Sequence, residues 1–241
     1  MLKIVIPMAG AGSRFTNAGH QRPKYLIEVS GKSLLEHSLS GLPLDLADEI
    51  YFVALRDHVV QYDLSTVISK ALGDRKFELL TVPAVTRGQA ETVLVCRRYI
   101  DTSDDLVIFN IDTYYKSHRQ RDLLSGKIPR YDGFLGSAYA LGVKWSFAET
   151  NETGFVTRTT EKVRISDNAL TGFYHFTKGS DFVTVASEAI DRGITTGSEF
   201  YIAPMYNALI QSGRKFVLDP VDEFIPLGTP EDIETAKGWL K

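Results

Sequence analysis

Short hydrophobic runs bounded by turn residues recur along the chain, and they predict buried β-strands. Each run is nearly continuous in apolar residues, a pattern typical of strands in a sheet that is covered on both faces. The runs lie at residues 4–7, 50–55, 77–82, 106–111, 134–141, 170–176 and 215–219. They predict a central sheet enclosed by helices.

Apolar positions with helical spacing separate the early strands. They predict helices over Ser33–Leu39, His58–Leu72 and Gln89–Tyr99. Because strands and helices alternate here, we expect a parallel, doubly wound sheet in the first half of the chain.

The second half is less regular. Closely spaced strands between Phe134 and Phe176 precede helical patterns at Ser180–Arg192 and Glu199–Gln211. Near the end, Thr229 followed by Pro230 is typical of a helix start, with threonine as N-cap and proline at the first helical position. The predicted fold is an α/β, Rossmann-like three-layer sandwich with a mixed, mainly parallel central sheet and a small added lobe.

Length and composition narrow the class of protein. The 241 residues, 44% of them hydrophobic, are enough for one domain with a sizeable core. Its 27 basic and 30 acidic residues are mixed along the chain, which argues against a nucleic-acid or anionic-membrane partner. A single cysteine, Cys96, and the absence of a signal-peptide pattern favour a cytoplasmic location.

A glycine loop follows the first predicted strand, in the stretch KIVIPMAGAGSRF. Such a loop exposes backbone N–H groups that bind phosphate. A dinucleotide-binding loop is disfavoured, because its third glycine would fall at Phe15 and no helix pattern opens there. Gly31-Lys32-Ser33 resembles the end of a P-loop, but the required earlier glycine would fall at Leu26. We interpret this tripeptide as a turn and a helix start.

Two basic residues accompany the glycine loop. Arg14 offers a planar guanidinium fork to phosphate oxygens, and Lys24 offers a point charge. Together they suit a triphosphate. The alternative is that both are ordinary solvated surface charges, as most basic residues are.

These residues belong to a larger pattern that resembles the sugar-phosphate nucleotidyltransferases, the pyrophosphorylases that make nucleotide sugars. Nearly the whole chain takes part in the resemblance, which here has no C-terminal extension. The matching stretches are Met8–Arg14, Pro23-Lys24, Leu34–His37, Gly88–Thr92, Asn110–Asp112, Glu161-Lys162, Leu170–Gly172 and Gly228–Asp232.

The resemblance implies a single domain over residues 1–241, with a nucleotide-binding half at about 1–112 and an acceptor-binding half at 113–241. It implies that Arg14 stabilises the departing pyrophosphate and that Lys24 bridges the α-phosphate and the attacking oxygen. Nucleotide contacts are implied for Ala9, Gly10, Ala11, Gly12, Ser13, Gly88 and Gln89. For Gly88 and Gln89 the alternative is the polar first turn of a surface helix.

The same resemblance implies that Asp112 is catalytic and holds Mg²⁺ at the carboxyl end of its strand, where ligands bind in such sheets. The alternative for Asp112 is a turn residue. The family's second metal-binding aspartate is missing before Gly228, so Asp219, Asp222, Glu223 or water would have to replace it. Acceptor contacts are implied for Tyr114, Glu161, Lys162, Gly172 and Glu199. The alternative for Tyr114 is a core position, since aromatic residues in apolar surroundings are more often core, and the alternative for Glu199 is the first turn of a helix.

The expected activity is transfer of a nucleoside monophosphate, pyrimidine favoured, from a nucleoside triphosphate to a phosphorylated small molecule, with release of pyrophosphate. A sugar 1-phosphate is the first choice of acceptor. A non-sugar phosphomonoester such as phosphocholine or a phosphorylated amide stays open, and so does a non-catalytic nucleotide or nucleotide-sugar binding module. By resemblance the pathway is capsular or surface polysaccharide assembly, and a homo-oligomer stays open.

Overall fold

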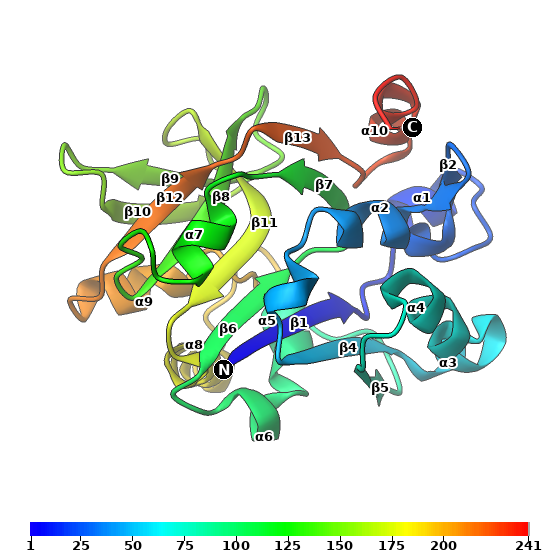
Figure 1. Cartoon of the computed structure of the whole chain (residues 1–241), viewed down its shortest axis with the longest axis horizontal. Helices are drawn as coiled ribbons and strands as arrows, with labels where there is room; N and C mark the ends of the chain where they lie inside the picture. Colours follow the sequence, from blue (N-terminus) through cyan, green and yellow to red (C-terminus); the bar gives the residue numbers. More distant parts are fainter. Residues whose placement is uncertain (241) are drawn as a thin grey trace.

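The computed structural model describes residues 1–240 and has a large mixed sheet at its centre (Figure 1). Its parallel part has the order β6-β1-β4-β5, and these strands are the apolar runs of the first half. β11 joins this part to the rest by pairing antiparallel with β6. The bounds are β1 Leu2–Met8, β4 Glu49–Leu55, β5 Glu78–Val82, β6 Asp105–Phe109 and β11 Asn168–Phe176.

The other part of the sheet belongs to the second half of the chain. β9 pairs antiparallel with β10 and β11, β8 pairs antiparallel with β11, and β12 pairs parallel with β8. Two small sheets, β2-β3 and β7-β13, lie apart from this sheet. The bounds are β2 Glu28–Val29, β3 Lys32–Ser33, β7 Thr113–Lys116, β8 Gly133–Tyr139, β9 Ser146–Thr150, β10 Val156–Glu161, β12 Phe216–Pro220 and β13 Glu223–Pro226.

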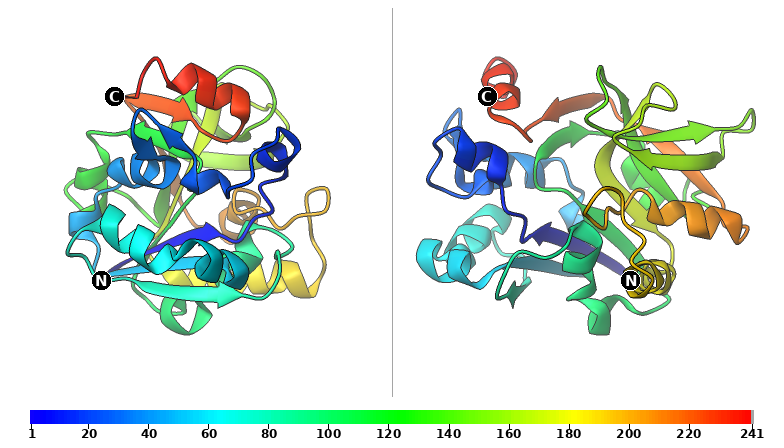
Figure 2. Two further views of the ribbon diagram at one scale, coloured as in Figure 1. Left: turned by 90° about the vertical axis from the view of Figure 1, so that its right-hand side faces the viewer. Right: turned by 180° about the vertical axis from the view of Figure 1, so that it is seen from behind.

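Helices cover both faces of the sheet, as Figure 2 shows from the side and from behind. The α-helices are α1 Ser13–Asn17, α2 Leu34–Ser40, α3 Arg56–Tyr62, α4 Leu64–Leu72, α5 Gln89–Leu94, α6 Arg97–Ile100, α7 Gln120–Leu124, α8 Gly179–Asp191, α9 Met205–Gln211 and α10 Pro230–Ala236. Two 3₁₀ turns, η1 Lys24–Leu26 and η2 Leu44–Leu46, complete the set. The predicted three-layer fold is confirmed.

Successive residues of β1 belong to different cores. Val5 packs on one face with residues of α5, α8 and α9. Ile4 and Ile6 pack on the opposite face with residues of α2 and α4. Both faces of this strand are therefore buried, which explains its continuous apolar sequence.

A third, smaller core ties the C-terminal helix to the start of the chain. Phe15 of α1 packs with Leu34 of α2 and with Leu227 and Ile233 around α10. Figure 1 shows α10 beside α1 and α2. Thr229 caps α10 by accepting a hydrogen bond from the Asp232 N–H, as predicted. This cluster brings the Gly228 turn next to the glycine loop.

Several predicted elements differ in their limits. The helix expected over His58–Leu72 is two helices, because Asp63 has a left-handed backbone (φ 45°). The helix expected over Gln89–Tyr99 likewise breaks after Leu94. The helix expected from Glu199 begins only at Met205. After the glycine loop the structure has a short helix, α1, that the sequence pattern did not reveal.

Candidate active site

A cavity of about 930 Å³ opens where β1 and β6 end, and both halves of the chain line it. The first half contributes the glycine loop, the Lys24 turn and the start of α5. The second half contributes β10–β11 residues, the segment before α9 and the Gly228 turn. The position agrees with the rule that ligands bind at the carboxyl ends of parallel strands.

The glycine loop forms one wall of the cavity. All of Ala9–Ser13 line it. Gly12 has a left-handed backbone (φ 60°) that turns the chain into α1. Arg14 follows in α1, and the buried Phe15 anchors this helix against α10. The sequence thus places a backbone-rich loop and an arginine at the same edge of the cavity.

Lys24 and Asp112 meet at the cavity although 88 residues separate them. The Lys24 ammonium lies 2.8 Å from Asp112 Oδ2, and the two side chains are 25% and 28% exposed. Burial alone would raise the pKa of Asp112, but the charge and hydrogen bond of Lys24, helped by Arg14, hold that pKa below its ordinary value. Asp112 is therefore ionised at neutral pH.

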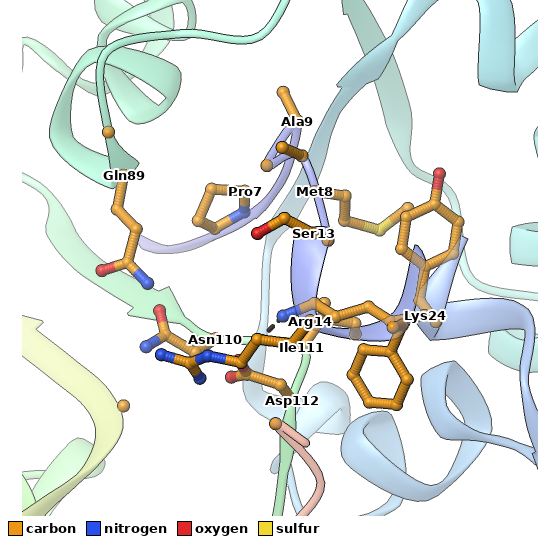
Figure 3. Close-up of a pocket in the computed structure, with 18 of the residues that line it drawn as sticks. Pro7, Met8, Ala9, Ser13, Arg14, Lys24, Gln89, Asn110, Ile111 and Asp112 are labelled. Carbon is orange, nitrogen blue, oxygen red and sulfur yellow. Dashed lines mark hydrogen bonds and ion pairs between the residues drawn. The ribbon is translucent and has the colours of Figure 1, made fainter. Parts of the chain in front are cut away.

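Figure 3 shows how these side chains converge. The Arg14 guanidinium extends toward Asn110, and Gln89 points into the cavity from the start of α5. The Asn110 Oδ1 atom is buried and has no hydrogen-bond partner within residues 1–240. β6 ends at Phe109, earlier than predicted, so Asn110 and Asp112 both lie in the turn that lines the cavity.

The loop of Gly88 is joined to the segment before α9. Phe200 N–H donates to the Arg87 carbonyl at 2.8 Å, and Ala90 N–H donates to the Phe200 carbonyl at 2.9 Å. Gly88 has φ 134°, and a Cβ there would lie 2.5 Å from Phe200 N. Only glycine fits this close approach. The pairing also holds Glu199 and Phe200 out of the helix that the sequence pattern predicted.

A network of side chains forms the opposite wall. Ser146 donates a hydrogen bond to the buried Glu161 carboxylate, and burial raises the pKa of Glu161. Lys162 donates to the Tyr201 hydroxyl at 2.5 Å, and that hydroxyl donates to Glu199 Oε1 at 3.0 Å. The hydrogen bond with Tyr201 raises the pKa of Lys162, so this ammonium is charged at neutral pH.

Gly172 lies between this wall and the Asp112 turn. Its carbonyl accepts a hydrogen bond from Asn110 N–H at 3.0 Å. Its φ is 87°, and a Cβ would lie 2.8 Å from Asn110 Cβ. The glycine therefore allows β11 to pass closely beside the Asp112 turn.

Most predicted site residues line the cavity, with one exception. Tyr114 is absent from the cavity wall, because it lies in β7 and packs with the third core beside α10. The proposed replacements for the missing aspartate also lie elsewhere. Asp219 is fully buried outside the cavity, Asp222 pairs with His118, and Glu223 pairs with Lys116.

Other cavity residues had no assigned role in the sequence analysis. Asp232 lines the cavity from the first turn of α10 and pairs with Lys144 at 2.6 Å. It lies within the matched Gly228–Asp232 stretch, so its position was available as a signal. The further lining residues include Asn110, Lys144, Trp145, Ser146 and Tyr201.

Comparison with known proteins gives the family. None of the protein-family models matches the chain. A crystal structure of a nucleoside-diphosphate-sugar pyrophosphorylase from Vibrio cholerae RC9 is 31% identical, with a TM-score of 0.84 over 96% of this chain and 98% of that one. The chain belongs to the sugar-phosphate nucleotidyltransferases.

Two further proteins are similar to the chain, one in sequence and one in fold. A UTP–glucose-1-phosphate uridylyltransferase from Haloferax volcanii is 27% identical over all of this chain and 97% of its own length. A Bacillus anthracis structure, described as a glucose-1-phosphate thymidylyltransferase in complex with sucrose, has a TM-score of 0.78 over 99% of this chain and 94% of that chain. At 16% identity it supports the fold.

The expected activity, nucleotidyl transfer with release of pyrophosphate by an enzyme of the pyrophosphorylase type, is therefore confirmed. Within residues 1–240, no helix of this sugar-phosphate nucleotidyltransferase combines the length and apolarity needed to cross a membrane.

Proposed function

We propose that this chain is a Mg²⁺-dependent enzyme that transfers a nucleoside monophosphate from a pyrimidine nucleoside triphosphate, UTP first, to a sugar 1-phosphate. The observation that carries the proposal is the Lys24–Asp112 pair, 2.8 Å apart, in a cavity that the glycine loop and the acceptor wall share. The printed name of the Haloferax volcanii relative supports UTP and glucose 1-phosphate as the first substrates to test.

The reaction joins two anions. A phosphate oxygen of the acceptor forms a bond to the α-phosphorus of the triphosphate, and the bond from that phosphorus to the bridging oxygen of the β-phosphate breaks. Pyrophosphate leaves with the electron pair. Because the nucleophile is already an anion, positioning and charge neutralisation matter more than a strong base.

Arg14 and Lys24 neutralise this charge. Arg14 holds the departing pyrophosphate through its planar fork, and Lys24 lies between the α-phosphate and the attacking oxygen. In the free protein the Lys24 ammonium is held at the cavity by Asp112. The pair therefore keeps Lys24 in place before the phosphates arrive.

The nucleotide lies along the glycine loop. Residues Ala9–Ser13 line the cavity, and in the proposed reaction their backbone N–H groups contact base, sugar or phosphates. Gly88 and Gln89 close this side, and the Gln89 amide both donates and accepts hydrogen bonds.

The acceptor lies against the opposite wall. Glu161 binds sugar hydroxyls and Lys162 binds the acceptor phosphate, while Glu199 adds a hydroxyl contact. Gly172 leaves room for the sugar beside the β11 backbone.

The residues at the Asp112 turn fit Mg²⁺, which prefers carboxylate and carbonyl oxygens and keeps several waters. A Cβ placed on Gly228 would lie 3.5 Å from Asp112 Oδ2 and 3.9 Å from Asp232 Oδ2, so both carboxylates lie beside Gly228. Asp112 pairs with Lys24 and Asp232 with Lys144, and a bound ion would share or replace these pairs. The buried, unpartnered Asn110 Oδ1 adds an acceptor atom two residues before Asp112. We infer that Asp112 and Asp232 hold the ion, in place of the missing family aspartate. Mg²⁺ bound there would supply positive charge to the phosphates.

Pyrophosphate release tests the proposal. Purified protein with Mg²⁺ is given UTP, CTP, dTTP, ATP or GTP, each with glucose 1-phosphate, other sugar 1-phosphates, phosphocholine or inositol 1-phosphate. We expect release only when both substrates are present, fastest with a pyrimidine triphosphate and a sugar 1-phosphate. Asp112→Asn should lower kcat/KM by about a thousandfold or more. Release with phosphocholine alone would move the acceptor to the non-sugar class, and no release with any pair would refute the proposal.

A cytoplasmic location and a role in capsular polysaccharide assembly remain predictions from the sequence, and a homo-oligomer stays open.

A further inference from the structure

A chain of hydrogen bonds crosses the acceptor wall through Tyr201, a residue that no motif in the sequence marks. The Lys162 ammonium donates to the Tyr201 hydroxyl at 2.5 Å and lies 4.7 Å from the centre of its ring. The same hydroxyl donates to Glu199 Oε1 at 3.0 Å. All three residues line the cavity.

Lys162 is fixed at both ends. Its backbone has a left-handed conformation (φ 57°), and its N–H donates to the Trp145 carbonyl at 2.9 Å. A lysine side chain has many rotamers, so fixing the backbone alone does not place its ammonium. Tyr201 holds that ammonium at the cavity wall.

The segment that carries Tyr201 is fixed to the Gly88 loop, the loop between Arg87 and Ala90. The neighbouring Phe200 makes two backbone hydrogen bonds to this loop, with Arg87 at 2.8 Å and Ala90 at 2.9 Å. The segment that carries Glu199 and Tyr201 is thus attached directly to the wall expected to bind the triphosphate. The segment Glu199–Tyr201 therefore fixes the position of the Lys162 ammonium relative to that wall, because Tyr201 binds the ammonium and Phe200 binds the wall.

The chemistry of a phenol suits this position. Its neutral oxygen accepts from an ammonium and its O–H donates to a carboxylate, so Tyr201 joins Lys162 to Glu199 without neutralising Lys162 directly. A carboxylate in direct contact with Lys162 would compete with a phosphate for the same charge. The phenol leaves the other ammonium hydrogens free for a phosphate.

We propose that Tyr201 is a positioning residue for the acceptor phosphate, acting through its hydrogen bond to Lys162. The inference rests on the proposed function, because it takes Lys162 as the residue that meets the acceptor phosphate. It adds Tyr201 to the acceptor site, from the segment that is hydrogen-bonded to the Gly88 loop.

Tyr201→Phe removes the hydroxyl and keeps the ring. With UTP and glucose 1-phosphate as substrates, we expect the KM for glucose 1-phosphate to rise about tenfold. The KM for UTP and kcat should change by less than about threefold, and the melting temperature should stay unchanged. Tyr139→Phe is the matched control, because Tyr139 is 67% exposed and lies outside the cavity wall. An unchanged KM for glucose 1-phosphate in Tyr201→Phe would overturn the inference.

A double-mutant cycle separates action through Lys162 from a general effect on the wall. Lys162→Met should raise the KM for glucose 1-phosphate more than Tyr201→Phe does. If Tyr201 acts through the ammonium, adding Tyr201→Phe to Lys162→Met should raise it no further. Fully additive effects would overturn the positioning role.

Direct binding distinguishes the failure of this inference from the failure of the proposed function. Trp145 and Trp239 are the two tryptophans, and Trp239→Phe leaves Trp145 at the cavity as the fluorescent reporter. Titration with glucose 1-phosphate should give a dissociation constant that Tyr201→Phe raises about tenfold. Equal constants would overturn the role of Tyr201, whereas no binding and no turnover with any acceptor would refute the proposed function itself.

Discussion

The two walls of the cavity differ in the atoms that form them: one consists mainly of backbone and the other of side chains. We call the wall proposed to bind the nucleotide the nucleotide wall, and the wall proposed to bind the acceptor the acceptor wall. The nucleotide wall is largely backbone, formed by Ala9–Gly12 and by Gly88, whose contact with Phe200 leaves no space for a Cβ. The acceptor wall is formed by side chains, with Glu161, Lys162 and Tyr201 joined by hydrogen bonds to their neighbours.

This difference separates two kinds of requirement. The shape of a backbone wall depends on a few glycines and on the path of the chain. Replacing one of these glycines disturbs the shape, whereas many other side chains can change without affecting it. A side-chain wall depends on partners far apart in sequence, such as Lys162 and Tyr201, 39 residues apart. We therefore expect changes in the first wall to affect folding and nucleotide binding together, and changes in the second to affect acceptor binding more selectively.

Apart from the loss already predicted for Asp112→Asn, the largest effect should come where the walls meet, at Lys24. Lys24→Met removes the cation that the proposed function places between the two substrates, and we expect kcat to fall by about 10²–10³-fold. Steady-state pyrophosphate release measures this. Lys127→Met is a matched control, because Lys127 pairs with Asp122 at 3.3 Å on the surface and lies outside the cavity wall. A kcat within threefold of the unaltered protein would remove Lys24 from the reaction.

Gly88→Ala tests the backbone wall. The new Cβ would lie 2.5 Å from Phe200 N and 2.7 Å from Phe200 O, at φ 134°, so the two segments must separate. We expect a loss of about 2–4 kcal/mol in the free energy of unfolding, with weaker UTP binding. Urea denaturation and calorimetric titration of UTP measure the two effects.

The control for Gly88→Ala is Gly154→Ala. Gly154 also has a positive φ, 83°, but a Cβ there meets no atom within 4 Å. It should lose about 1 kcal/mol from backbone strain, with unchanged UTP binding. Equal losses at both positions would show that strain alone, and not the Phe200 contact, sets the cost at Gly88.

The contrast also explains how much the sequence could predict. Gly10, Gly12 and Gly88 can be recognised in the sequence as glycines of loops, and Asp112 can be recognised because it follows an apolar strand. All four line the cavity in the structure. The central strands and the capped start of α10 were found for the same reason, because local patterns determine them.

What remained hidden depends on contacts that only the fold creates. The helix expected from Glu199 begins six residues late, at Met205, because Phe200 pairs with the Arg87 loop instead. Tyr201 therefore reaches Lys162 from a segment that looked helical. Tyr114 follows the second of its two interpretations, because β7 packs that partly buried side chain against the third core beside α10 and outside the cavity wall.

The smallest expected effect concerns the free energy of unfolding, and it comes from comparing Asp112 at the cavity with Asp219 in the sheet. Asp112 has Lys24 as partner, and its pKa lies below 3.8. Asp219, in β12, is fully buried, and by distance and angle neither carboxylate oxygen has a hydrogen-bond partner within residues 1–240. Ser117 and Arg119 lie close enough to favour its charged form in part, but burial outweighs them. Burial raises the pKa of Asp219 above 3.8.

These shifts have opposite consequences for the pH dependence of stability. As the pH rises past 3.8, the unfolded chain releases the Asp219 proton before the folded protein does, so the free energy of unfolding falls until the folded pKa is passed. Asp112 contributes in the opposite sense, because its stabilising ion pair is complete above 3.8 and is lost as the pH falls through its folded pKa.

Asp219→Asn should therefore stabilise the protein at neutral pH by about 1 kcal/mol, since an amide avoids the cost of a buried charge, and the gain should shrink as the pH falls toward about 4. Urea denaturation at several pH values measures both effects. Asp112→Asn is the informative counterpart, because it removes a paired charge and should give no such gain near neutrality. A neutral-pH loss in Asp219→Asn would mean that the carboxylate makes a stabilising contact in solution, and the distinction between the two aspartates would fail.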